Sequence, residues 1–188
     1  NETTLSWETI YFEQLFSEHL MDDVYYTVNE DSITHQGIDP NTELLIIPAF
    51  AAKDSNYTFY IDSIFSVIPS LGTQIREFTA RGGRIYAEGN GVYFLQKAGF
   101  LENGAVDYES GNFGSGLESV VATSLADNAN YGFSAAANKL YGSKFPAVNS
   151  SHVHASGTLA GNPCIFYIDP AHTSGSRVLC NTGLPTVH

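Results

Sequence analysis

The chain has 188 residues, of which 43% are hydrophobic and 13% aromatic, so it holds enough apolar material for one packed domain and is neither disordered nor fibrous. Twenty acidic against eight basic residues give a formal net charge of −12, a field that repels nucleic acid and anionic lipid. No apolar run approaches the roughly 20 residues of a membrane-spanning helix. We therefore expect a single domain over residues 1–188, with no nucleic-acid partner and no membrane insertion.

The first half of the chain alternates predicted helices and strands. Residues 7–21 carry apolar side chains at helical spacing, and Ser6 can cap that helix. Residues 24–28 are β-branched and aromatic and predict a strand. Residues 43–47 predict a fully buried strand that ends at Pro48.

The middle of the chain contains the most strongly specified unit. Thr73 can cap a helix that stops at Gly82 and Gly83, and residues 84–87 then predict a short strand. A turn at residues 89–91, Gly-Asn-Gly, opens a further helix over residues 92–98. We therefore expect a strand, a tight glycine turn and a helix in succession.

The last third of the chain has weaker patterns. Residues 103–116 are rich in Gly, Asn and Ser and indicate a loop, whereas residues 117–123 predict a strand and residues 135–140 a weak helical turn. Residues 164–169 and 175–180 predict a C-terminal β-hairpin. The whole pattern favours one α/β domain with a mainly parallel sheet.

The two cysteines fall in this predicted hairpin. If its strands pair around a loop at residues 170–174, Cys164 lies directly opposite Cys180 and a cross-strand disulfide is geometrically possible. Two buried thiols in core strands are an equally reasonable interpretation.

Three Asn-x-Ser/Thr triplets are candidate sites for an N-linked glycan, at Asn1, Asn56 and Asn149. The acidic composition, with few lysines, points in the same direction. We expect an extracellular or cell-surface location.

A resemblance is carried by residues 83–95, Gly-Arg-Ile-Tyr-Ala-Glu-Gly-Asn-Gly-Val-Tyr-Phe-Leu. A strand that ends in a sharp turn and feeds a helix presents the turn residue at the carboxyl edge of the sheet, where enzymes place nucleophiles. The segment resembles the nucleophile elbow of the class I glutamine amidotransferase-like superfamily. It is most similar to the domain at the amino end of some biotin protein ligases, and it also resembles a segment of cobyrinic acid diamide synthases.

The resemblance extends over residues 9–100 and implies a flavodoxin-like three-layer α/β sandwich. Residues 44–50, Leu-Leu-Ile-Ile-Pro-Ala-Phe, resemble the family's strand end that contributes to the oxyanion hole. The family also has a central first strand ahead of the helix at residues 7–21. We expect sequence outside this chain to supply that strand.

The chain departs from the family where the chemistry would occur. Gly89 stands at the position of the nucleophilic Cys and has no side chain with which to attack a substrate. Ala49 and Phe50 stand where the family has oxyanion-hole glycines. Residues 181–186, Asn-Thr-Gly-Leu-Pro-Thr, replace the family's His-Pro-Glu, so the resemblance implies a pseudoenzyme without a cofactor.

The degenerate pocket that the resemblance implies comprises Glu88, Gly89, Asn90, Tyr93 and His154. Glu88 is a candidate base or ligand at the sheet edge, although it can equally stabilise the turn by hydrogen bonds to loop N–H groups.

Residues 151–154, Ser-His-Val-His, faintly resemble the Ser-Tyr-Val-His of diamide synthases, which would give His154 a residual site role. His152 and His154 can also form a polar strand face, or hold a metal if a third ligand converges, but no such ligand is recognisable and we assign no metal site. His172 falls in the predicted hairpin loop, where we expect it to be exposed.

Aromatic residues are predicted near the carboxyl edge of the sheet, on or near loops. Exposed rings of Tyr57, Phe59, Tyr60 and Tyr93 would suit carbohydrate or protein contacts. Alternatively, Phe59 and Ile61 belong to a covering segment and pack inward.

Two functional hypotheses follow from these features. The first is a non-catalytic amidotransferase-like domain that serves as a structural or protein-interaction module of a larger secreted or cell-surface protein, with a protein partner or neighbouring domain. The second is a hydrolase with altered chemistry, which requires Glu88 and a histidine to converge within about 3 Å of a common point.

Overall fold

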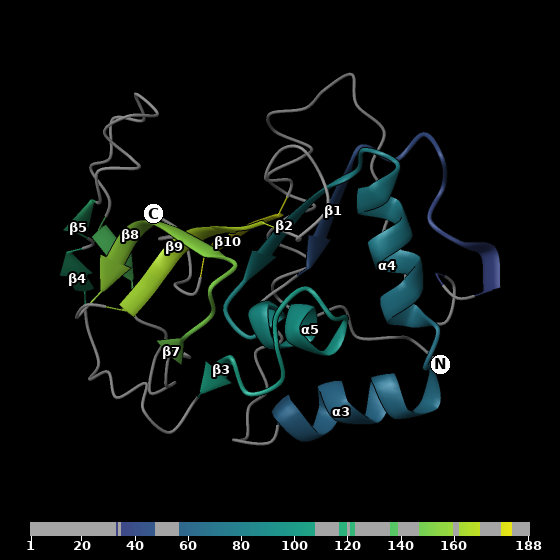
Figure 1. Cartoon of the computed structure of the whole chain (residues 1–188), viewed down its shortest axis with the longest axis horizontal. Coiled ribbons are helices and arrows are strands. Elements are labelled where there is room, and N and C mark those ends of the chain that lie inside the picture. Colours follow the sequence, from purple (N-terminus) through teal and green to yellow (C-terminus); the bar gives the residue numbers. More distant parts are fainter. Residues whose placement is uncertain are drawn as a thin grey trace.

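A six-stranded mixed sheet forms the frame of the computed structural model (Figure 1). The structure describes residues 33, 35–47, 57–107, 117–119, 121–122, 136–138, 147–159, 162–169 and 178–181. In order across the sheet, the strands are β1 (Leu44–Ile47), β2 (Arg84–Glu88), β10 (Val178–Asn181), β9 (Asn162–Ile168), β8 (Val153–Leu159) and β5 (Val121–Ala122).

The pairing divides this sheet into two parts. β1 and β10 both run parallel to β2, whereas β10, β9, β8 and β5 pair antiparallel with one another. The chain is therefore an α/β protein, as expected, but its described sheet is mixed rather than mainly parallel. The C-terminal antiparallel pair that the sequence predicts is present as β9 and β10.

Two short antiparallel pairs lie outside this sheet. β3 (Val106–Asp107) pairs with β7 (Ala147–Val148), and β4 (Leu117–Ser119) pairs with β6 (Ala136–Asn138). The helical turn predicted at residues 135–140 is therefore wrong, because pairing with β4 overrides the weak helical preference of two alanines. The strand predicted at residues 117–123 is present as β4 and β5.

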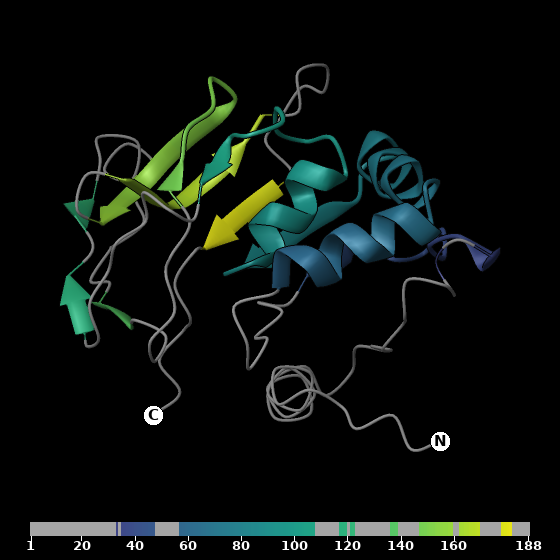
Figure 2. The same cartoon turned by 90° about the horizontal axis from the view of Figure 1, so that it is seen from below.

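Among the described residues, the helices beside the sheet are α3 (Tyr57–Val67), α4 (Leu71–Ala80) and α5 (Gly91–Lys97). Figures 1 and 2 show them gathered at the β1–β2 end, while β8 and β5 lie at the other end. Tyr57, Phe59 and Tyr60, which the sequence places on or near loops, belong to the first turn of α3. No helix in the described ranges is long and apolar enough to span a bilayer.

The bounds of α4 show which local signals were informative. The helix begins after Ser70 rather than at Thr73, and Leu71, in its first turn, is fully buried. Its end lies where the sequence predicts, since Gly82 has a φ of 109° and Gly83 N–H donates to Phe78 O at 3.0 Å. β2 follows at once, which confirms the predicted strand.

The sheet has two faces of different character. Side chains on the helix-covered face include Ile47, Ile85, Ala87, Val178 and Phe166, and they form one core cluster with residues of all three helices. Because side chains alternate along a strand, the neighbours of these residues lie on the opposite face, which we call the second face. The second face includes the side chains of Leu44, Ile46, Arg84, Tyr86, Glu88, Leu179, Tyr167, Ile165 and His154.

β1 differs from the fully buried strand that the sequence predicts. Ile47 is 4% exposed but Leu44 is 48% exposed, and β1 lies at the end of the described sheet. A short run of apolar residues is typical of a strand that is covered on both faces. The run itself does not show which neighbours the strand has, so the exposure of Leu44 does not follow from it.

The register of β9 and β10 differs from the predicted one by two residues. Cys180 lies opposite Phe166 rather than Cys164, and the two cysteines are buried and are not joined in a disulfide. Burial raises the pKa of the Cys164 thiol to about 11 and also raises the pKa of Cys180.

Several predictions concern residues outside the described ranges. These are the helix at residues 7–21, the strand at residues 24–28, the glycosylation candidates Asn1 and Asn56, and the positions of Ala49, Phe50 and His172.

Candidate functional site

The turn between β2 and α5 has the shape that the sequence predicts. Gly89 is buried and has a φ of 46°, in the left-handed region that favours glycine. Its carbonyl accepts the Val92 N–H at 3.3 Å, and the Asn90 carbonyl accepts the Tyr93 N–H at 3.0 Å. The chain thus passes from the strand through a glycine into a helix within a few residues.

Glu88 is a buried carboxylate on the second face at the end of β2. Glu88 is 3% exposed, and the Tyr86 hydroxyl donates a hydrogen bond to Glu88 Oε1 at 2.8 Å. The two side chains meet because residues two apart on a strand share a face. A buried carboxylate needs such donors, so this contact supports the structural interpretation of Glu88.

His154 lies on the second face but far from Glu88. The register aligns Tyr86, Leu179, Tyr167 and His154 in one row across β2, β10, β9 and β8. Three strand spacings separate the ends of such a row by about 14 Å. Glu88 lies two residues beyond this row, so the backbone does not bring Glu88 and His154 to the common point that the hydrolase hypothesis requires.

Tyr93 connects two helices. Its hydroxyl donates to Asp62 Oδ1 of α3 at 2.9 Å, and the same Asp62 oxygen is 2.9 Å from Lys97 Nζ. The Lys97 ammonium also lies 6.0 Å from the centre of the Tyr93 ring. Tyr93, a predicted pocket residue, therefore joins α5 to α3, and Asn90 precedes α5 without a side-chain capping bond.

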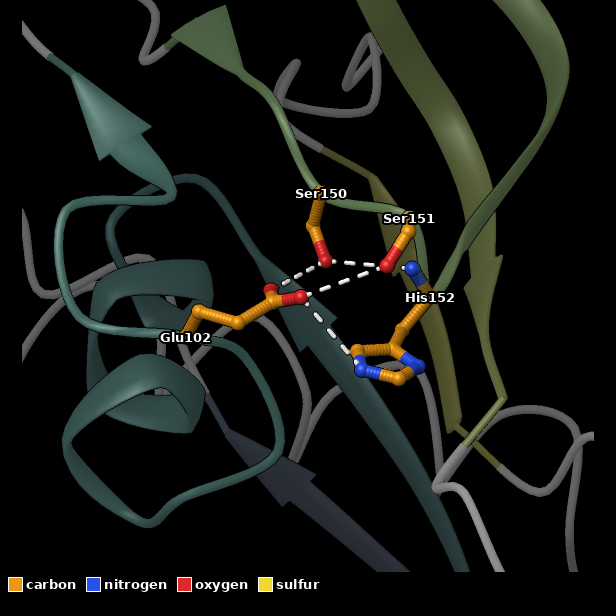
Figure 3. Close-up of polar contacts among 4 residues, drawn as sticks. All are labelled: Glu102, Ser150, Ser151 and His152. Atoms are coloured by element: carbon orange, nitrogen blue, oxygen red, sulfur yellow. Dashed lines mark hydrogen bonds and ion pairs between the residues drawn. The ribbon is translucent and has the colours of Figure 1, made fainter.

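A second polar cluster lies on the surface, where the turn before β8 meets the loop after α5 (Figure 3). Glu102 Oε2 accepts a hydrogen bond from the Ser150 hydroxyl at 2.5 Å, and Oε1 accepts one from Ser151 at 3.4 Å. The same Oε1 is 3.3 Å from His152 Nε2. The His152 backbone N–H donates to Ser150 Oγ at 3.2 Å, which closes the turn.

The electrostatics of this cluster centre on Glu102. Hydrogen bonds from Ser150 and from its own backbone N–H lower the pKa of the Glu102 carboxyl, and His152 and Ser151 contribute in the same direction. These contacts favour the ionised carboxylate, the form that accepts hydrogen bonds from both hydroxyls.

The order of contacts decides what the cluster can do. A serine nucleophile is activated when its hydroxyl contacts a base that a carboxylate in turn orients. Here one oxygen of the Glu102 carboxylate accepts the hydrogen bond from the Ser150 hydroxyl, and the other oxygen contacts the His152 imidazole. The arrangement holds the loop at Glu102 against the start of β8 and does not reproduce a catalytic triad.

Sequence reasoning singled out His152 but missed Glu102 and Ser150 as its partners. Ser150 and Glu102 are 48 positions apart in the chain, and no periodicity connects them. The only local signal was the pair of serines beside His152.

The remaining predicted features are placed as follows. Asn149 is exposed, and its N–H donates to Ala105 O at 2.8 Å. Within the described residues, no three His, Cys, Asp or Glu side chains are grouped closely enough to hold a metal ion. Comparison of the chain with models of protein families, with curated proteins and with solved structures finds no match.

Proposed function

We propose that this chain is a non-catalytic domain of the class I glutamine amidotransferase-like type, with a flavodoxin-like three-layer organisation. It would serve as a structural or protein-interaction module of a larger secreted or cell-surface protein. The unit of β2, the Gly89 turn and α5 supports the kinship, because a left-handed residue between a strand and a helix is what a nucleophile elbow requires.

The observation that carries the non-catalytic assignment is the chemistry of this turn. Gly89 occupies the place of the nucleophile and offers no reactive atom. The neighbouring Glu88 is buried against Tyr86 rather than paired with His154. Among the described residues, the turn keeps the backbone shape of an elbow, its central residue carries no side chain, and Glu88 lies apart from His154.

Exposed apolar side chains support the interaction role. Val67 is 79% exposed and Tyr60 is 51% exposed, and residues seven apart lie on the same side of a helix such as α3. Tyrosine is enriched in protein interfaces because it buries a large area at low entropic cost. The exposed Asn149 sequon supports a glycosylated, extracellular protein.

The catalytic part of the proposal is tested by activity. The full chain is assayed for glutaminase, amidase and esterase activity beside Glu88→Gln and His154→Asn variants. We expect the three proteins to show the same background rate. A rate above background that Glu88→Gln or His154→Asn reduces would establish the hydrolase instead.

The interaction part is tested by photo-cross-linking in the producing cells. A benzophenone amino acid replaces Tyr60 or Val67 of the full-length protein, and the exposed Asp107 serves as the control position. We expect a protein adduct from the α3 positions and none from Asp107. Equal yields at all three positions, or no adduct at any, would contradict the interaction role.

A further inference from the structure

The dipeptide Asn-Gly occurs twice in the chain, at residues 90–91 and at residues 103–104. Glycine has no Cβ, so its main-chain nitrogen is open to close approach by other atoms. In this dipeptide the nitrogen can attack the side-chain amide carbon of the asparagine and displace ammonia. The attack requires the peptide group between the two residues to rotate until the nitrogen meets the amide carbon. The two dipeptides have different surroundings in the fold.

Asn103 lies in an exposed turn that connects α5 to β3 (Figure 1). Ala105 N–H donates to Glu102 O at 3.0 Å, and Gly104 has a φ of 82°. This hydrogen bond joins the two outer residues of a four-residue turn, so the central peptide group, between Asn103 and Gly104, is not part of it. Residues 102–104 are all exposed, and a Cβ on Gly104 would meet nothing within 4 Å beyond its chain neighbours. The peptide group that must rotate therefore has free space around it.

Asn90 is held by the first turn of α5. Its carbonyl accepts the Tyr93 N–H at 3.0 Å and the Phe94 N–H at 3.3 Å. Its ψ of −11° is helical, and the following Gly91 is buried. Rotation of the peptide group between Asn90 and Gly91 would move this carbonyl and break both hydrogen bonds. The start of α5 therefore restrains Asn90.

From this difference, we propose that Asn103 is a site of spontaneous deamidation in the folded protein and that Asn90 is protected. The Gly104 nitrogen forms a bond to Asn103 Cγ, the bond from Cγ to Nδ2 breaks, and ammonia leaves with the proton that the Gly104 nitrogen loses. Water then opens the cyclic imide. Addition of water to Cγ gives aspartate, and addition to the main-chain carbonyl gives isoaspartate. The proposal goes beyond the proposed function and does not depend on it.

The reaction would change the path of the chain into β3. Isoaspartate routes the peptide link through Cγ and so adds one carbon atom to the main chain within the turn. Directly after the turn, Ala105 O accepts the Asn149 N–H at 2.8 Å, and Val106 N–H donates to Gln96 Oε1 at 2.8 Å. We expect the amides of Asn149 and Val106 to exchange severalfold faster with solvent in the isoaspartate form.

Peptide mapping by mass spectrometry tests the proposal on the full chain. The purified protein is incubated at mildly alkaline pH and sampled over time. Lys97 lies between the two dipeptides, so trypsin places them in separate peptides. In the native protein, we expect Asn103 to deamidate at least about tenfold faster than Asn90. In guanidinium chloride the fold no longer restrains Asn90, so we expect the two rates to become similar.

Gly104→Ala is the matched variant. A methyl group on residue 104 hinders attack by its nitrogen and meets no neighbouring side chain, so we expect deamidation of Asn103 to slow severalfold. The products report the route, because direct hydrolysis of the side-chain amide by water gives aspartate alone. We expect both aspartate and isoaspartate at position 103. An unchanged rate in Gly104→Ala would contradict attack by this nitrogen.

The outcomes are distinct. Fast deamidation of Asn103 with isoaspartate, slow deamidation of Asn90 and a difference that disappears on unfolding support the proposal. Equal rates in the native protein would show that the fold does not distinguish the two sites. An Asn103 that reacts only after unfolding would show that the turn restrains it, and aspartate alone would exclude the cyclic imide. Any of these last three results would overturn the proposal, while the enzymatic and cross-linking tests of the proposed function would be unaffected.

Discussion

One glutamate of this protein is buried and another is exposed, and the comparison shows how burial changes what a hydrogen bond contributes to stability. Glu88 is buried at the end of β2 and accepts a hydrogen bond from Tyr86, whereas Glu102 is exposed and contacts two serines and a histidine. The partners of Glu102, serine and histidine, are residue types that are common in catalytic sites. Water competes for the hydrogen bonds of the exposed Glu102. Glu88 is shielded from water, so its carboxylate depends on the hydrogen bond from Tyr86.

We therefore expect the residues around the turn after β2 to contribute strongly to the stability of the fold, and the surface cluster at Glu102 to contribute little. Substitutions around the turn should therefore cost much more folding free energy than substitutions around Glu102.

The largest effect is expected from Phe78→Ala, just before β2. Phe78 is fully buried, and its ring lies so close to Gly83 that a Cβ there would be 2.3 Å from Cζ. Removing a buried phenylalanine ring destabilises a protein by about 3–5 kcal/mol. Urea denaturation measures the loss.

The matched control is Val67→Ala, because Val67 is an exposed apolar residue of a neighbouring helix. We expect a change within about 0.5 kcal/mol for this surface substitution. Similar losses in the two variants would mean that α4 does not pack on β2 as described.

Tyr86→Phe should come next in magnitude. It removes the hydroxyl that donates to Glu88 Oε1 and leaves a buried carboxylate with one donor fewer. Loss of one partner of a buried polar group costs about 1–3 kcal/mol. The same denaturation experiment measures it.

A double-mutant cycle with Glu88→Gln isolates the pair. A neutral amide depends less on the Tyr86 hydroxyl, so we expect Tyr86→Phe to cost less in the Glu88→Gln background. Equal costs in both backgrounds would show that the two side chains do not interact.

Gly89→Ala should cost about 1–2 kcal/mol, because its φ of 46° places a Cβ near the following carbonyl. Thermal or urea unfolding measures the loss. Gly104→Ala is the control, since Gly104 also has a positive φ but lies in an exposed turn with open space around a Cβ. We expect the buried Gly89 to be the more sensitive of the two, and a neutral Gly89→Ala would contradict the left-handed turn.

These positions show which parts of the fold a sequence can predict. The β2–turn–α5 unit was predictable because Gly82 and Gly89 adopt positive φ values that few other residues adopt, and because Gly83 lies against the Phe78 ring with no room for a Cβ. The exposure of Leu44 was not predictable, because it depends on neighbours distant in the chain. The predicted register of β9 and β10 was wrong by two residues, because the sequence between the strands carries no two-residue turn signal that would set their alignment.

The candidate site was predictable only in part. Gly89 and the carboxylate of Glu88 were found from a local pattern, but the Tyr86 partner was not singled out. The cluster at Glu102 was missed because its members meet only through the tertiary fold.

The cysteines provide a further test of burial. Both are buried thiols with raised pKa values, and no disulfide joins them, so the native protein at pH 8 should react very slowly with a thiol reagent. After denaturation without reductant, two thiols per chain should react. Two unreactive cysteines in the denatured chain would instead establish the disulfide that the sequence suggested.

The smallest effect is expected at the exposed cluster. Ser150→Ala removes the main contact that lowers the Glu102 pKa, so that pKa should rise towards the ordinary value of a glutamate. The pKa of Glu102 is lower in the folded state than in the unfolded state. The ionised carboxylate therefore stabilises the fold at pH values above the unfolded-state pKa, and this stabilisation is lost as the pH falls through the folded-state pKa. Carbon-detected titration of Glu102 measures the shift, and an unchanged Glu102 titration curve would remove Ser150 from the cluster. At pH 7, we expect little change in melting temperature.

The most direct test of the central claim is an experimental map of this chain within its native assembly, examined around Gly89 and α3. We expect another protein or a neighbouring domain to contact the exposed side of α3, and Glu88 to remain buried against Tyr86. An open, water-filled cleft in which Glu88 faces a histidine would contradict the account and identify the chain as an enzyme.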